Sequence, residues 1–178
     1  MTNRLFVLAA IILIVIGCES RNESVRQLLM DFEQSHIIIP DDMTMICDGK
    51  IMPSQIKDSI SSFVVYVAAE ECSDCRIAHL WDYSGFFEWS KQSNRSQVLL
   101  IFSPLPEDMS YVLDRIISSG FIYPVFVDAN QSFSNYNSIP HNSITHSFLL
   151  DKLGYPVLVG DPIGNNRLLK LYKKQLLN

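Results

Sequence analysis

Positive charge is scarce in this sequence, and none of it is clustered. The 178 residues contain 14 Lys and Arg against 19 Asp and Glu, which gives a formal net charge of −5 at pH 7. A nucleic-acid surface is expected to show grouped Lys and Arg, so the sequence predicts no nucleic-acid partner. A G-x-S-x-G motif, a P-loop and a dinucleotide-binding fingerprint are also missing. The sequence therefore lacks the motifs that a hydrolase or a nucleotide-dependent enzyme of these families needs.

Cysteine is sparse as well, with four residues at positions 18, 47, 72 and 75. Four are too few for a disulfide scaffold of this length. The chain also has no internal repeat and no low-complexity tract, and 48% of its residues are hydrophobic. This composition predicts one folded domain with a substantial core.

The N-terminal residues contain an uncharged apolar run from Leu5 to Gly17. Thirteen helical residues reach only about 20 Å, which is short of the roughly 30 Å hydrocarbon core. The run is therefore typical of the apolar part of a signal peptide, which we predict to comprise residues 1–17. The segment Val15-Ile16-Gly17-Cys18 resembles the bacterial lipobox, which implies that Cys18 is acylated, that residues 18–23 form a tether and that residues 24–178 form the domain. An ordinary signal peptide or a short anchor with an incidental cysteine is the alternative.

A lipid anchor on Cys18 predicts that the domain lies in the cell envelope, facing the periplasm or the outer surface. Disulfides persist there, whereas the cytosol keeps thiols reduced. A pair of cysteines that cycles between thiol and disulfide is then favoured over a free reactive thiol.

Strand and helix patterns alternate along the rest of the chain. The sequence predicts strands at 63–68, 98–102, 125–128, 147–150 and 156–159, a hairpin within 43–52 turning at Asp48-Gly49, and helices at 24–35, after the cysteine pair, at 107–120 and from Asn165 or Asn166 onward. The helix after the cysteine pair is expected to run about four turns, with Ile77, Leu80, Trp81, Ser84 and Phe87 on one face. The expected fold is a three-layer α/β domain with a mixed central sheet flanked by helices.

Cys72-Ser73-Asp74-Cys75 directly follows a predicted buried strand and opens a predicted helix. Two intervening residues at a helix start allow disulfide geometry, and unpaired backbone N–H groups favour a thiolate at the first position. Cys72 is thus expected to attack, and Cys75, one turn in and more enclosed, to resolve the mixed disulfide. A static disulfide and half of a metal site remain alternatives.

The segment from Phe63 to Phe87 resembles the active-site segment of the thioredoxin-like superfamily, and the whole chain resembles its membrane-tethered, TlpA-like branch. Ser147 to Gly154 (SFLLDKLG) is similar to that family's "TFLIDxxG" strand and turn. The resemblance implies a thioredoxin-like fold with an N-terminal helix and β-hairpin extension. It also implies thiol-disulfide exchange with protein or small-molecule thiols, a membrane electron donor, and no organic or metal cofactor.

The same resemblance implies a substrate groove beside the cysteines. Ser73 and Asp74 lie between them, and Thr145 occupies the position of the family's cis-proline, three residues before Phe148. Glu71 stands where the family usually has an aromatic residue.

Three carboxylates surround Cys72 in sequence, those of Glu70, Glu71 and Asp74. Nearby negative charge disfavours a thiolate and so makes the disulfide harder to reduce. We therefore expect the pair to act as a reductant rather than as a strong oxidant.

Two other functions stay open on the sequence. One is a non-catalytic thioredoxin-like lipoprotein that binds a partner and carries a fixed disulfide. The other is a metal carrier, in which His79, on the face of Cys72 and Cys75, is joined by His141 or His146. Cys47 is expected to be a small buried residue on a strand.

Overall fold

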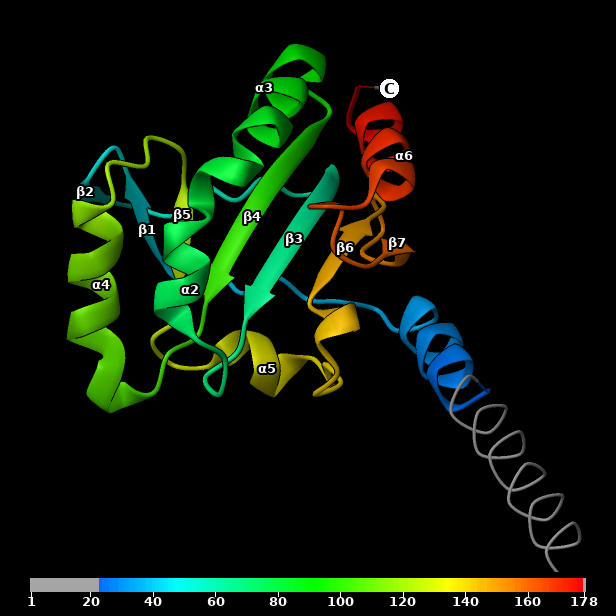
Figure 1. Ribbon diagram of the computed structural model, residues 1–178, viewed down its shortest axis with the longest axis horizontal. Coiled ribbons are helices and arrows are strands. Elements are labelled where there is room, and N and C mark those ends of the chain that lie inside the picture. The colour runs from blue at the N-terminus through cyan, green and yellow to red at the C-terminus, as the bar shows by residue number, and fades with distance from the viewer. Residues whose placement is uncertain (1–22, 178) are drawn as a thin grey trace, which may run out of the picture.

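The computed structural model describes residues 23–177 and contains a seven-stranded mixed sheet in the order β2-β1-β5-β4-β3-β6-β7 (Figure 1). The strands are β1 (Thr44–Cys47), β2 (Lys50–Met52), β3 (Ser61–Val67), β4 (Ser96–Phe102), β5 (Val125–Val127), β6 (Ser147–Leu150) and β7 (Pro156–Val159). The helices are α2 (Ser73–Ala78), α3 (Ser84–Ser93), α4 (Met109–Ser118), α5 (Ser132–Tyr136) and α6 (Asn166–Leu177), with 3-10 turns η1 (Leu80–Tyr83), η2 (Pro106–Asp108) and η3 (Ser143–Thr145). Residues 23–33 are also helical.

The centre of the sheet is parallel and both of its sides are antiparallel. Strands β3, β4 and β5 run parallel, with Val65 opposite Leu100 and Phe102 opposite Val127. The hairpin β1–β2 pairs antiparallel with β5, and the hairpin β6–β7 pairs antiparallel with β3 through β6. The predicted N-terminal hairpin is therefore part of the main sheet, and its turn uses Asp48 and Gly49 with positive φ.

Two apolar layers cover the two faces of the sheet. Alternate residues of β3 point to opposite faces, so that Phe63 and Val65 belong to one buried cluster and Val64 and Tyr66 to the other. The first cluster includes side chains from α2, α3, α4 and α6. The second includes Phe32 of the N-terminal helical residues and a phenylalanine of α5. The predicted three-layer α/β architecture with a mixed sheet is confirmed.

The helix after the cysteine pair is broken, which corrects the expectation of one helix of four turns. His79 ends α2 with φ −108° and ψ 13°, and the 3-10 turn η1 leads into α3. Because a 3-10 turn has three residues, burial follows a spacing of three from Leu80 to Tyr83 to Phe86. Trp81, expected on the inner face, is instead 50% exposed and packs edge-on against Phe121.

The last helix begins as predicted but differs in its inner face. The Asn165 side chain accepts hydrogen bonds from the backbone N–H groups of Arg167 and Leu168, which caps α6. Tyr172 and Leu176 are buried, whereas Leu171, predicted to face inward, is 47% exposed.

The predicted signal peptide, residues 1–17, and the lipidation site Cys18 lie outside the described residues. Within residues 23–177, no helix has the length and apolar character needed to cross a membrane.

Candidate functional site

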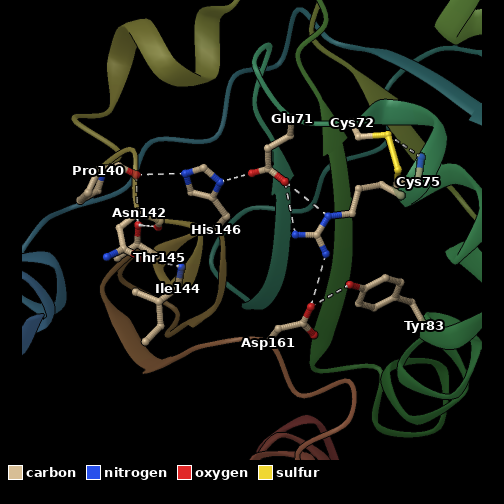
Figure 2. A network of polar contacts seen from close by, with 11 residues as sticks. Glu71, Cys72, Cys75, Tyr83, Pro140, Asn142, Ile144, Thr145, His146 and Asp161 are labelled. Atoms are coloured by element: carbon tan, nitrogen blue, oxygen red, sulfur yellow. Dashed lines mark hydrogen bonds and ion pairs between the residues drawn. A yellow bond between two sulfur atoms is a disulfide. The ribbon is translucent and has the colours of Figure 1, made fainter.

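Cys72 and Cys75 form a disulfide at the carboxyl end of β3, where the chain enters α2 (Figure 2). Their Cα atoms are 5.3 Å apart. Cys72 is the N-cap of α2, and its sulfur accepts a hydrogen bond of 3.3 Å from the backbone N–H of Cys75. Both cysteines are exposed. Among the residues of α2, only Ile77 is buried.

A polar network begins at Glu71, the residue before the disulfide. Arg76 donates to a Glu71 carboxylate oxygen through Nε and Nη2, at 3.4 and 3.3 Å, and through Nη1 to Asp161 Oδ2 at 3.4 Å. The Tyr83 hydroxyl also donates to Asp161 Oδ2, at 3.4 Å. Figure 2 shows this chain of contacts running from Glu71 towards Tyr83. Arg76 therefore links the segment before α2 to the loop after β7.

His146 contacts the same glutamate from another loop. Its Nδ1 is hydrogen-bonded to Glu71 Oε1, and its Nε2 lies 3.0 Å from the carbonyl oxygen of Pro140. A carbonyl only accepts, so Nε2 must carry a hydrogen. The contact between Nδ1 and the Glu71 carboxylate likewise needs a hydrogen between its two atoms. His146 is only 3% exposed, so this is a buried acid–base pair beside the disulfide.

The surroundings shift the pKa values of several groups in this network, among them Glu71 and Tyr83. Burial acts to raise the pKa of the Glu71 carboxyl, but the hydrogen bond to His146 and the charges of His146 and Arg76 outweigh it and hold the pKa below its ordinary value. Burial, together with the negative charge of Asp161, raises the pKa of the Tyr83 hydroxyl well above its ordinary range. Glu71 is therefore ionised and Tyr83 neutral at physiological pH.

The other two carboxylates near Cys72 also have partners. Asp74 accepts hydrogen bonds from the Tyr111 hydroxyl at 2.6 Å and from Arg115 Nε at 2.9 Å, and these contacts lower its pKa. Glu70 is hydrogen-bonded to His141 at 3.0 Å, which lowers its pKa. The expectation of a reductant rests on unpaired carboxylates at these positions. The structure removes that premise, since each has at least one partner.

A groove of about 240 Å³ opens beside the first cysteine. It is lined by Cys72, Ser73 and Asp74 from the start of α2 and by Asp108 and Tyr111 from the η2–α4 segment. The structure thus brings two of the three predicted groove residues together with the first sulfur. Cys75 does not line this groove.

Thr145, the third predicted groove residue, is fully buried. Its hydroxyl donates to the carbonyl oxygens of Pro140 at 3.2 Å and of Asn142 at 2.8 Å, and it closes the turn η3. Its peptide bonds are trans, as are all others between residues 23 and 177. The expectation that Thr145 borders the groove is therefore wrong for its side chain, because that side chain is used to hold its own loop.

The histidines proposed for a metal site are engaged separately. His79 Nδ1 lies 3.0 Å from Asp82 Oδ2, and His141 and His146 pair with different glutamates. In the part of the chain that the structure describes, no group of three or more His, Cys, Asp or Glu is placed to hold a metal ion.

Cys47 lies on β1, as predicted, but it is only partly buried rather than buried. Its sulfur donates to the carbonyl oxygen of Ile122 at 3.3 Å. Burial and the charge of Asp48 raise the pKa of its thiol.

Arg76, Asp161, Tyr111 and Arg115 were not identified from the sequence as site residues. The contacts that bring them to the site span 37 to 85 positions. The only local signal was Arg76, which follows Cys75 directly and lies five positions after Glu71.

No protein-family model and no curated protein matches the chain. Solved structures are similar in fold. A candidate thiol:disulfide interchange protein, DsbE, from Chlorobium tepidum has a TM-score of 0.52 at 14% identity, covering 81% of this chain and 99% of its own. The exposed lipoprotein thioredoxin Etrx1 of Streptococcus pneumoniae has a TM-score of 0.46 at 20% identity, covering 76% and 99%. A thioredoxin-like protein of Porphyromonas gingivalis has a TM-score of 0.44 at 16% identity, covering 80% and 94%.

The likeness to the first of these structures, together with the sheet order and the position of the disulfide, identifies the fold as thioredoxin-like. At 14% identity the likeness describes the fold alone. The chemistry has to be argued from the site.

Proposed function

We propose that the protein is a thiol-disulfide oxidoreductase whose redox centre is the Cys72–Cys75 disulfide. The observation that carries this proposal is the exposure of both cysteines at the end of a buried strand, with Cys72 lining an open groove. A disulfide that served only to stabilise the fold would close a loop of four residues, which constrains the unfolded chain little. An exposed bond of this kind is better suited to exchange than to stability.

Cys72 is the attacking residue in this proposal. In the reduced protein its thiolate attacks a substrate disulfide, the substrate S–S bond breaks, and one substrate thiol leaves. The thiolate of Cys75 then attacks the Cys72 sulfur of the mixed disulfide and releases the second thiol. Two electrons pass from the protein to the substrate, and the reverse sequence reduces the protein. The N–H of Cys75 is placed to stabilise negative charge on the Cys72 sulfur.

A trapping experiment tests the chemistry. In a Cys75→Ser variant the resolving thiol is missing, so mixed disulfides on Cys72 accumulate in cells and appear as discrete adducts on non-reducing gels. A Cys72→Ser variant should trap none, and a Cys47→Ser variant should match the wild type. If Cys75→Ser traps no adduct, the disulfide is static and the protein is a binding module with this fold.

The cellular setting is a separate part of the proposal. We infer from the lipobox-like segment ending at Cys18 that the protein is a lipoprotein of the cell envelope, facing the periplasm or outer surface, as in the TlpA-like branch. Substrates would then be protein or small-molecule thiols of that compartment, with a membrane protein as electron donor.

Labelling cells with an alkyne-bearing fatty acid tests this anchoring. The wild type should be labelled and should fractionate with membranes, and a Cys18→Ser variant should do neither. Labelling that persists in Cys18→Ser would contradict the assigned lipidation site. The Cys47→Ser variant serves as the matched control, because it also removes one cysteine.

A further inference from the structure

We propose that the groove beside Cys72 selects thiol and disulfide substrates that carry a positive charge next to the reacting sulfur, and that Asp108 is the residue responsible. This inference rests on the proposed redox function of Cys72 and adds the substrate class. Cys72 and Asp108 line the same groove, Cys72 at the start of α2 and Asp108 just before α4.

Within the part of the chain that the structure describes, Asp108 is the carboxylate of the groove that has no ion-pair partner. The other two carboxylates in its lining are balanced: Glu71 by Arg76 and Asp74 by Arg115. Among the described residues, by contrast, none forms an ion pair or hydrogen bond with the Asp108 side chain, which makes no capping contact to α4 either. No Lys or Arg belongs to the described residues that line the groove. A cationic substituent would therefore be attracted, and an anionic one would find no free cation.

Tyr111 adds a second reason to favour a cation. Its hydroxyl is held by Asp74 at 2.6 Å, so the orientation of the ring is fixed, while 51% of the residue stays exposed. An exposed aromatic ring attracts ammonium and guanidinium groups through its negative face. The groove thus offers a carboxylate and a fixed ring on the α4 side of the reactive sulfur.

The size of the groove sets the expected effect. A space of this volume is roughly 8 Å across, so a charged substituent lies within about that distance of Asp108. In water, the interaction between two unit charges about 8 Å apart changes a reaction rate roughly twofold to threefold. The Asp108 carboxylate should raise the rate with a cationic disulfide and lower the rate with an anionic one by this factor. Replacing Asp108 by Asn should therefore lower the ratio of these two rates about fivefold at low ionic strength.

Three small disulfides of different charge test the inference. The reduced full-length protein in a neutral detergent is mixed with cystamine, hydroxyethyl disulfide or dithiodiglycolate, which are cationic, neutral and anionic. Formation of the Cys72–Cys75 disulfide is followed by acid quenching, alkylation and mass spectrometry. In each reaction the protein loses two electrons, and the probe disulfide is converted to two thiols.

Asp108→Asn is compared with Asp114→Asn, which makes the same charge change on α4 outside the groove lining. We expect Asp108→Asn to reduce the cationic-to-anionic ratio about fivefold, Asp108→Lys to reduce it further, and Asp114→Asn to leave it within twofold. The difference should disappear in about 0.5 M salt, since screening is then nearly complete. Rates with the neutral disulfide should not change.

The outcomes separate the two proposals. Oxidation by all three probes, with a ratio that Asp108→Asn changes no more than Asp114→Asn does, would overturn the selectivity and leave the redox function standing. Failure of all three probes to oxidise the cysteine pair would overturn the redox function itself.

Discussion

The imidazole of His146 is hydrogen-bonded to the carboxylate of Glu71, the residue that precedes the first cysteine of the disulfide. The two residues are 75 positions apart, and the contact joins the loop before β6 to the loop after β3. The neighbouring Glu70 makes a similar contact with His141, but there both side chains are exposed. The chain therefore contains one buried and one exposed version of the same pair.

The first prediction compares these two pairs by stability. Replacing His146 by Phe removes the partner of a partly buried carboxylate and leaves the carbonyl of Pro140 without its donor, so we expect a loss of about 3 kcal/mol in the free energy of unfolding. The matched variant His141→Phe disrupts an exposed pair and should change stability little. Urea unfolding of both variants measures the difference. Equal losses would mean that burial does not strengthen the His146–Glu71 pair.

The second prediction concerns the pH dependence of stability. The pKa of Glu71 is lowered in the folded protein from its ordinary value of 4.5. A lowered folded pKa contributes stability above the unfolded pKa, and that stability is lost as the pH falls through the folded pKa. Glu71→Gln should therefore be less stable than the wild type by about 2 kcal/mol at pH 7, and the gap should narrow below pH 4.5. Urea unfolding at pH 7 and at pH 3, with Glu70→Gln as control, checks this, and a gap that widens in acid would contradict it.

A third prediction follows from the partners of Asp74. Arg115→Gln leaves the Asp74 carboxylate without its ion pair beside Cys72. Negative charge destabilises the reduced, thiolate form, so the reduction potential should become more negative by an amount on the order of 10 mV. Equilibration with glutathione at low ionic strength measures the potential, and salt should reduce the shift. Asp74→Asn combined with Arg115→Gln is the control, because it removes both charges and should return the potential towards the wild-type value.

The fourth prediction is that Cys47 reacts slowly. Its thiol has a raised pKa because of burial, and its sulfur is already used in a hydrogen bond to a carbonyl. At pH 7.5 iodoacetamide should therefore label Cys47 more than tenfold more slowly than Cys72 in the reduced protein. Peptide mapping by mass spectrometry distinguishes the two sites. Comparable rates would show that the β1 strand opens readily.

The strands of this fold were predictable from sequence because their signals are local. Phe63 to Ala68 is an unbroken apolar run, which is typical of a strand that is covered on both faces. The Asp48-Gly49 pair is a turn signal, and it marks the separate hairpin of β1 and β2. The break at His79 was not predictable, since Leu80, Tyr83 and Phe86 are spaced by three and fit a regular helix nearly as well. The helical spacing buries Leu80 and Phe87, and a spacing of three buries Leu80, Tyr83 and Phe86. Packing against the sheet determines which residues are covered.

Part of the site was predictable from the sequence and part was not. The two cysteines and the residues between them are contiguous, so the sequence pattern around them predicted their position at a strand–helix junction. The ion pairs of the neighbouring carboxylates were not predictable. Glu71 and Asp74 read as bare carboxylates in sequence, and their partners His146 and Arg115 reach them only through the tertiary fold.

The helical residues 23–33 are joined to the body at one end. Phe32 is buried and packs edge-on against Phe148, with ring centroids 5.1 Å apart, whereas none of residues 23–31 is buried. A helix rises about 1.5 Å per residue, so these nine residues span roughly 14 Å. If Cys18 carries the proposed lipid, these helical residues form part of the connection between that lipid and the sheet. The nine residues before Phe32 would then hold a defined length of about 14 Å within that connection.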